Sequence, residues 1–101
     1  MDRVFVIGGA GYMGRGIVQA CAQAGYQVCI NDISEELIKK SMAAIEWSLR
    51  KLESKKLLRD SSETILKRII VEKDLEVAST SDWVIETITE NKELKLALFR
   101  K

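Results

Sequence analysis

The hexamer GAGYMG at residues 9–14 has the glycine spacing of a turn that binds the diphosphate of a dinucleotide. In such a turn, Gly9 permits a tight bend, Gly11 lets a diphosphate approach the backbone, and Gly14 lets the next helix lie close to the sheet. The N–H groups at the start of that helix, together with its dipole, attract phosphate oxygens. The alternative is a tight strand-to-helix turn without a ligand. We favour the dinucleotide-binding turn over the turn without a ligand because of the residues that surround the hexamer.

An acidic residue, Asp32, stands eighteen residues beyond the hexamer at the end of a second apolar run. A carboxylate in this place accepts hydrogen bonds from both hydroxyls of the adenosine ribose and repels a 2′-phosphate, which favours NAD over NADP. No lysine or arginine lies between Arg15 and Lys39 to receive such a phosphate. The alternative is that Asp32 caps the next helix, because Glu35 completes a capping-box spacing, although Ser34 could provide that cap instead.

These residues require a scaffold, and the apolar pattern predicts alternating strands and helices. We expect strands at 4–8, 27–31, 69–71 and 83–88. We expect helices at 11–24, from Ser34 onward, at 63–68 and from Asn91 onward, the last with Leu94, Lys95 and Leu98 on neighbouring faces. This order predicts a doubly wound α/β sheet with a ligand crevice at the carboxyl ends of its strands. In a 3-2-1-4 order, the strand at 83–88 would be an uncovered edge, which indicates truncation or pairing with a second copy.

Composition narrows the class of protein. The chain has 101 residues, 47% of them hydrophobic and 31% charged, which suits one globular domain. A net charge of +1 with scattered signs indicates neither a nucleic-acid partner nor an acidic membrane, and no apolar run is long enough to span a bilayer. Cys21 and Cys29 form no C-x-x-C pair, so we expect reduced thiols and a cytoplasmic location. The chain has no histidine, so it offers no imidazole base and no imidazole metal ligand.

Four segments carry a resemblance to a known family: GGAGYMGRGI, NDIS, IEWSLRKLESKK and SDWVIETITENKELK. Together they resemble the amino-terminal portion of the NAD-dependent 3-hydroxyacyl-CoA dehydrogenases, including the 3-hydroxybutyryl-CoA enzymes. The resemblance implies an incomplete Rossmann-type NAD-binding domain over residues 1–101, with a helical arm protruding after the second strand. It assigns NAD contacts to Gly9, Gly11, Tyr12, Met13, Gly14, Asp32, Glu90 and Lys95. Spacing alone favours a helix-terminal acid and a solvated basic face for Glu90 and Lys95, and the resemblance reverses that preference.

The same resemblance implies that the long helix receives part of coenzyme A through Ser48 and Lys55. Their seven-residue spacing puts both on one side of a helix, with Lys51 between them. Without the resemblance, such a helix face is more often merely solvated. The family's catalytic histidine and glutamate and its helical carboxyl-terminal domain have no counterpart in these 101 residues, so we identify no catalytic residue here.

The resemblance implies an enzyme of fatty-acid metabolism that interconverts (S)-3-hydroxyacyl-CoA and 3-ketoacyl-CoA by hydride transfer to or from NAD. This chain would hold the cofactor and, alone, bind NAD weakly and turn nothing over. An acyl-CoA substrate and the missing carboxyl-terminal domain would be its partners. A non-catalytic NAD-binding module or sensor is the alternative, because it fits the missing histidine. A third possibility is another β-hydroxyacid dehydrogenase relative that lacks CoA binding.

Overall fold

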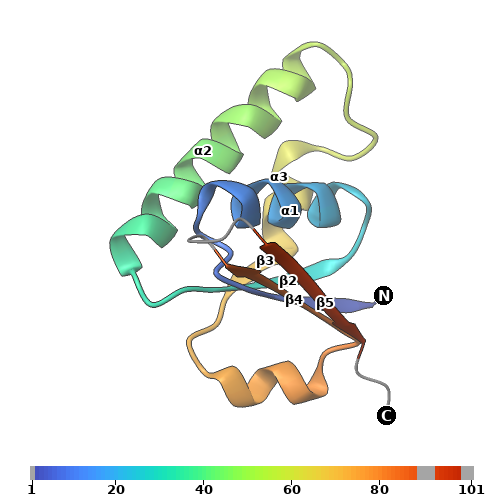
Figure 1. Cartoon of the computed structure of the whole chain (residues 1–101). Coiled ribbons are helices and arrows are strands. Elements are labelled where there is room, and N and C mark those ends of the chain that lie inside the picture. The colour runs from blue at the N-terminus through green and yellow to red at the C-terminus, as the bar shows by residue number, and fades with distance from the viewer. Residues whose placement is uncertain (1, 89–92, 99–101) are drawn as a thin grey trace.

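The chain forms an α/β structure around one five-stranded sheet. The structure is a computed structural model that describes residues 2–88 and 93–98 (Figure 1). The strands lie in the order β3-β2-β1-β4-β5, which confirms the predicted 3-2-1-4 order and adds a strand to it. Four strands run parallel and the fifth is antiparallel to β4: β1 (Arg3–Ile7), β2 (Gln27–Asn31), β3 (Ile69–Val71), β4 (Trp83–Ile88) and β5 (Glu93–Leu98).

Helices cover both faces of the sheet, as a doubly wound arrangement requires. Figure 1 shows α1 (Tyr12–Gln23), α2 (Glu35–Ser54) and α3 (Ser62–Lys67) on one side, and the short 3₁₀ helix η1 (Leu75–Thr80) on the other. Because alternate side chains of a strand point to opposite faces, β1 sends Val4 and Val6 to the larger core and Phe5 to the smaller one. All three are buried, so the central strand is enclosed on both sides.

Helix α2 begins at a serine cap and buries one continuous face. The hydroxyl of Ser34 accepts a hydrogen bond from the backbone N–H of Leu37, 3.2 Å away, and thereby satisfies one of the free donors at the helix start. The buried face runs from Ile38 to Leu49 and contacts α1 and α3. The expected helix is therefore present, whereas a separate protruding arm is not confirmed. In the described part of the chain, no helix is long and apolar enough to cross a membrane.

The end of α2 is joined to the start of α3 through one carboxylate. Glu53 accepts hydrogen bonds from the backbone N–H of Ser62 at 2.9 Å and from its hydroxyl at 2.8 Å. The bond from the backbone N–H, and to a smaller extent the bond from the hydroxyl, lowers the pKa of Glu53, although desolvation of the carboxylate opposes them. Ser62 is buried, so its two donors would otherwise lack partners.

The helix predicted from Asn91 onward is wrong for residues 93–98, which form β5. Leu94, Leu96 and Leu98 recur at every second position, which is the period of a strand. An antiparallel partner also satisfies the N–H and C=O groups along the edge of β4, a gain that a helix would not provide. Lys95, expected at the start of a helix, lies in β5 opposite Glu86 of β4. Asn91 falls outside the described residues.

The prediction of an uncovered edge at residues 83–88 is therefore also wrong. All six residues of β4 have a partner in β5, from Trp83 opposite Leu98 to Ile88 opposite Glu93. The sequence-based reason for expecting a second copy at this edge is thereby removed.

We expect Glu53→Gln to remove an acid-sensitive part of the fold's stability. The pKa of Glu53 lies below its ordinary value of 4.5 in the folded chain, so the unfolded state binds this proton more readily. The carboxylate accordingly stabilises the fold above pH 4.5, and this contribution is lost as the pH falls through the lowered pKa. In urea unfolding, the difference in free energy of unfolding between parent and variant should shrink as the solution is acidified below pH 4.5.

The matched variant is Ser62→Ala, which removes the hydroxyl bond and keeps the backbone one. It should retain part of the pH-dependent difference. A parent-to-variant difference that stays constant as the pH falls would contradict this role of Glu53.

Candidate functional site

The glycine turn lies where the carboxyl ends of three parallel strands meet. It follows β1, and its N–H groups at Gly8 and Gly9 donate to the carbonyl of Asn31, the last residue of β2, at 2.8 and 3.0 Å. From the end of β4, the hydroxyl of Thr87 donates to the carbonyl of Gly8 at 3.0 Å. Neighbouring strands therefore hold the turn on both sides, at the edge of the sheet where ligands of such folds bind.

The tight bend is made by Gly8, not by Gly9 as the spacing predicted. Gly8 has a φ of +77°, which side chains disfavour, whereas no such φ occurs at Gly9. Gly9 is required for a different reason: a Cβ there would lie 2.8 Å from Cγ1 of Ile30 and 3.2 Å from the carbonyl oxygen of Val6. The physical constraint at Gly9 is thus packing against the sheet.

Gly14 brings α1 against the end of β1, as predicted. A Cβ on Gly14 would lie 2.4 Å from the carbonyl oxygen of Gly8 and 2.7 Å from the Cα of Gly9. Both contacts are with backbone, which cannot move aside as a flexible side chain could. Only glycine therefore permits this approach of helix to turn.

The first turn of α1 has free hydrogen-bond donors. Its N-cap, Gly11, has no side chain to cap it, and the first turn contains no acidic residue. Serines cap α2 and α3, so α1 differs from both. Among the described residues, none accepts a hydrogen bond from the N–H of Tyr12, Met13 or Gly14. These donors and the helix dipole suit the diphosphate of a dinucleotide.

Asp32 lies beside this turn and is not a helix cap. Its carboxylate accepts hydrogen bonds from the backbone N–H of Ala10 at 3.3 Å and of Ser34 at 3.1 Å. The capping alternative for Asp32 is therefore wrong, since Ser34 caps α2. Asp32 also lines an open hollow of about 410 Å³, together with Ile7, Gly8, Gly11, Asn31, Ile33, Ser34 and Leu37. The glycine turn and the acid thus share one hollow.

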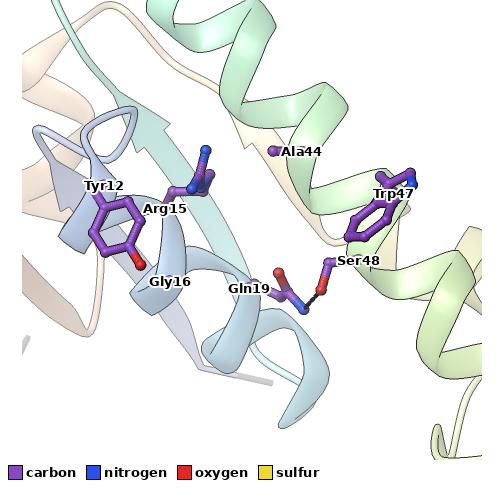
Figure 2. Close-up of a pocket in the computed structure, with 7 residues that line it drawn as sticks. All are labelled: Tyr12, Arg15, Gly16, Gln19, Ala44, Trp47 and Ser48. Atoms are coloured by element: carbon purple, nitrogen blue, oxygen red, sulfur yellow. Dashed lines mark hydrogen bonds between the residues drawn. The ribbon is translucent and has the colours of Figure 1, made fainter.

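A second hollow of about 440 Å³ lies between α1 and α2 (Figure 2). Ser48 projects into it from α2, and its hydroxyl accepts a hydrogen bond from Nε2 of Gln19 at 2.9 Å. Two aromatic rings of this hollow each lie under a cation: Tyr12 under Arg15, which also lines the hollow, at 5.4 Å, and Trp47 under Lys51, which does not line it, at 4.9 Å. The remaining lining residues are Gly16 and Ala44.

The other predicted site residues are not brought into these hollows by the described contacts. Lys55 is the exposed C-cap of α2 and is not among the residues that line the second hollow. Lys95 has a described backbone in β5 only, and Glu90 lies outside the described residues. The assignments of all the site residues to NAD and CoA remain predictions.

Sequence reasoning missed residues that shape the site. Asn31 and Thr87 hold the turn through hydrogen bonds, and Ser41 of α2 donates to the carbonyl of Ala10 at 2.6 Å. One signal was available for Ser41. It lies three residues after Ile38 and four before Ile45, so a polar side chain interrupts an apolar helical face.

Comparisons with known proteins agree with this geometry. Residues 3–101 match the family model described as "3-hydroxyacyl-CoA dehydrogenase, NAD binding domain". A 3-hydroxybutyryl-CoA dehydrogenase of Bradyrhizobium diazoefficiens is 38% identical, over 100% of this chain and 34% of that protein. The human mitochondrial hydroxyacyl-coenzyme A dehydrogenase has the same identity and coverage. This chain spans about a third of the length of these relatives.

Solved structures of the same kind share the fold. The (S)-3-hydroxybutyryl-CoA dehydrogenase from Ralstonia eutropha superposes with a TM-score of 0.79 at 37% identity, over 90% of this chain and 32% of that one. The 3-hydroxybutyryl-CoA dehydrogenase from Escherichia coli K12 also gives a TM-score of 0.79, at 36% identity, over 88% of this chain and 19% of that one.

We expect Gly14→Ala to destabilise the fold and Gly16→Ala to stabilise it. The Cβ at position 14 would lie 2.4 Å from a carbonyl oxygen, whereas at position 16 it would meet nothing within 4 Å. Overpacking of this kind costs about 1–3 kcal/mol, and alanine in an open helix position gains up to about 1 kcal/mol over glycine. Chemical unfolding of the two variants measures both effects, and shifts of the same sign would contradict the close approach of α1.

Proposed function

The chain belongs to the family of NAD-binding domains of 3-hydroxyacyl-CoA dehydrogenases, and on that premise we propose that its glycine turn holds NAD within a larger oxidoreductase. That enzyme interconverts (S)-3-hydroxyacyl-CoA and 3-ketoacyl-CoA. The observation that carries the proposal is the uncapped start of α1 beside Asp32. When bound, NAD supplies the hydride acceptor, and this chain supplies position and electrostatics.

The diphosphate is bound by backbone in this proposal. Tyr12, Met13 and Gly14 contribute N–H groups that have no acceptor among the described residues. Gly9 and Gly11 shape the turn without side chains that would obstruct the ligand. Binding therefore depends on the shape of the turn more than on any charged side chain.

The adenosine ribose is bound by Asp32. Two backbone N–H groups, from Ala10 and Ser34, orient the carboxylate and leave its remaining lone pairs for ribose hydroxyls. The negative charge disfavours a 2′-phosphate at the same place. NAD is accordingly the preferred cofactor. Glu90 and Lys95 are further NAD contacts on the grounds of family resemblance alone.

The acyl-CoA substrate approaches α2 in this proposal. The hydroxyl of Ser48 accepts a hydrogen bond from Gln19 and so keeps its own proton to donate to a CoA oxygen. Lys55 at the end of the helix would attract a CoA phosphate as a point charge. The second hollow, with exposed Trp47 beside Ser48, supports this placement.

The catalytic base belongs to a part of the enzyme outside these residues. The chain contains no histidine, so it cannot supply the imidazole that removes a hydroxyl proton in this family. We propose that a carboxyl-terminal helical domain provides it. A cytoplasmic location, expected from the cysteine pattern, is part of the same proposal.

We expect Asp32→Asn to reduce discrimination between the two cofactors. The parent chain should bind NAD at least about tenfold more tightly than NADP, because the carboxylate repels the added phosphate. The amide has the same shape without the charge, so the ratio should fall to about threefold or less. Calorimetric titration with both nucleotides measures the ratio. Glu63→Gln, a matched loss of charge at an exposed position of α3, should leave the ratio unchanged. Equal affinities in the parent chain would contradict the role of Asp32.

We also expect the 101-residue chain alone to catalyse no reduction of acetoacetyl-CoA by NADH, because the proton donor is missing. The absorbance of NADH over time, with and without the chain, measures this directly. A protein-dependent decrease would contradict the assignment of the catalytic base to another domain.

A further inference from the structure

One peptide group in the glycine turn is held by a side chain from α2. The hydroxyl of Ser41 lies 2.6 Å from the carbonyl oxygen of Ala10, and both residues are buried. We propose that Ser41 is a positioning residue for the diphosphate, which it never touches. The proposal rests on the proposed function, since it concerns the same cofactor.

Ser41 is not needed to fill the core. Its neighbours on the buried face of α2, Ile38 and Ile45, are apolar, and alanine would follow the same pattern. A buried hydroxyl costs free energy unless it finds a partner, and this one finds the turn. It is the contact through which α2 reaches the backbone of the turn.

The geometry of a peptide group explains why this contact controls the turn. The carbonyl of Ala10 and the N–H of Gly11 belong to one planar peptide group and point in opposite directions. The N–H donates to the carbonyl of Gly8 at 3.2 Å, and the carbonyl accepts from Ser41. The peptide group is thereby held at both ends, immediately before the N-cap of α1.

The same bond keeps a donor free for the ligand. If α1 began one residue earlier, the N–H of Gly14 would donate to the carbonyl of Ala10, four residues before it. In the structure that carbonyl is oriented toward Ser41, and the first backbone bond of α1 instead joins the N–H of Arg15 to Gly11 at 2.8 Å. Ser41 therefore favours the conformation in which the Gly14 N–H is available to a phosphate oxygen.

The effect should be confined to the diphosphate. Asp32 holds the preceding N–H, that of Ala10, and is itself held by Ser34. The ribose subsite thus keeps its own support when Ser41 is changed. A ligand with a diphosphate should respond to the change, and a nucleoside should not.

The test compares ADP-ribose with adenosine by NMR titration of the full chain. Ser41→Ala leaves the Ala10 carbonyl without its donor, so affinity for ADP-ribose should fall about tenfold while affinity for adenosine changes less than about twofold. Ser62→Ala is the matched control, because it also removes a buried hydroxyl bond, to Glu53, but far from the turn. It should leave the ratio of the two affinities unchanged.

The conservative variant Ser41→Thr retains the hydroxyl and should restore binding of ADP-ribose to within about threefold of the parent. Equal changes for both ligands in Ser41→Ala, or the same change in Ser62→Ala, would overturn the proposal.

A second measurement uses the parent chain and stands even where the alanine variant fails to fold. ADP-ribose should shift the amide signal of Gly14, and adenosine should not. An unshifted Gly14 signal in a parent that binds ADP-ribose overturns the role of Ser41 alone, whereas a parent that binds neither ligand overturns the proposed function with it.

Discussion

The site depends on the close contact between the start of α1 and the turn that follows β1. A Cβ on Gly14 would lie 2.4 Å from the carbonyl oxygen of Gly8, so the helix can approach this closely only because residue 14 is glycine. This approach aims the free N–H groups of the first turn out of the carboxyl edge of the sheet, where the parallel strands end. In the proposed site, Asp32 and the hollow beside it can contribute to dinucleotide binding only because these donors lie next to them.

The backbone polar groups of the turn fall into two sets, one hydrogen-bonded within the protein and one without a partner among the described residues. Each of the turn's peptide groups up to Gly11 has a partner in β2, α2, the β2–α2 connection or the turn itself, whereas the N–H groups of Tyr12, Met13 and Gly14 have none among the described residues. Saturating one part of a loop makes it rigid, while the unsatisfied part keeps its capacity to bind. A rigid set of donors loses little entropy when an anion arrives. The backbone here is therefore organised for a ligand before it binds.

Sequence reasoning recovered the parallel sheet, its order and the place of the glycine turn, because these follow from local periodicity and from glycine chemistry. It assigned the tight bend to Gly9, since the motif starts there, whereas the positive φ belongs to Gly8. It mistook β5 for a helix, because Leu94 and Leu98 fit a helical spacing as well as an alternating one. Ser41 and Thr87 were missed because their roles depend on tertiary contacts, 31 and 79 residues away along the chain. The polar interruption of an apolar helix face was a local signal for Ser41, but no local pattern indicates which distant residue is the partner.

The bond from Thr87 to the turn has a consequence for folding. It joins residues separated by 79 positions. The same threonine excludes a side chain at position 8, because a Cβ on Gly8 would lie 2.5 Å from the hydroxyl oxygen of Thr87. Contacts of such long sequence separation form late, because the intervening loop must first be closed. A nascent chain on the ribosome would thus contain the complete glycine motif long before it could bind a nucleotide through it. The turn reaches its binding conformation only when β4 has paired with β1.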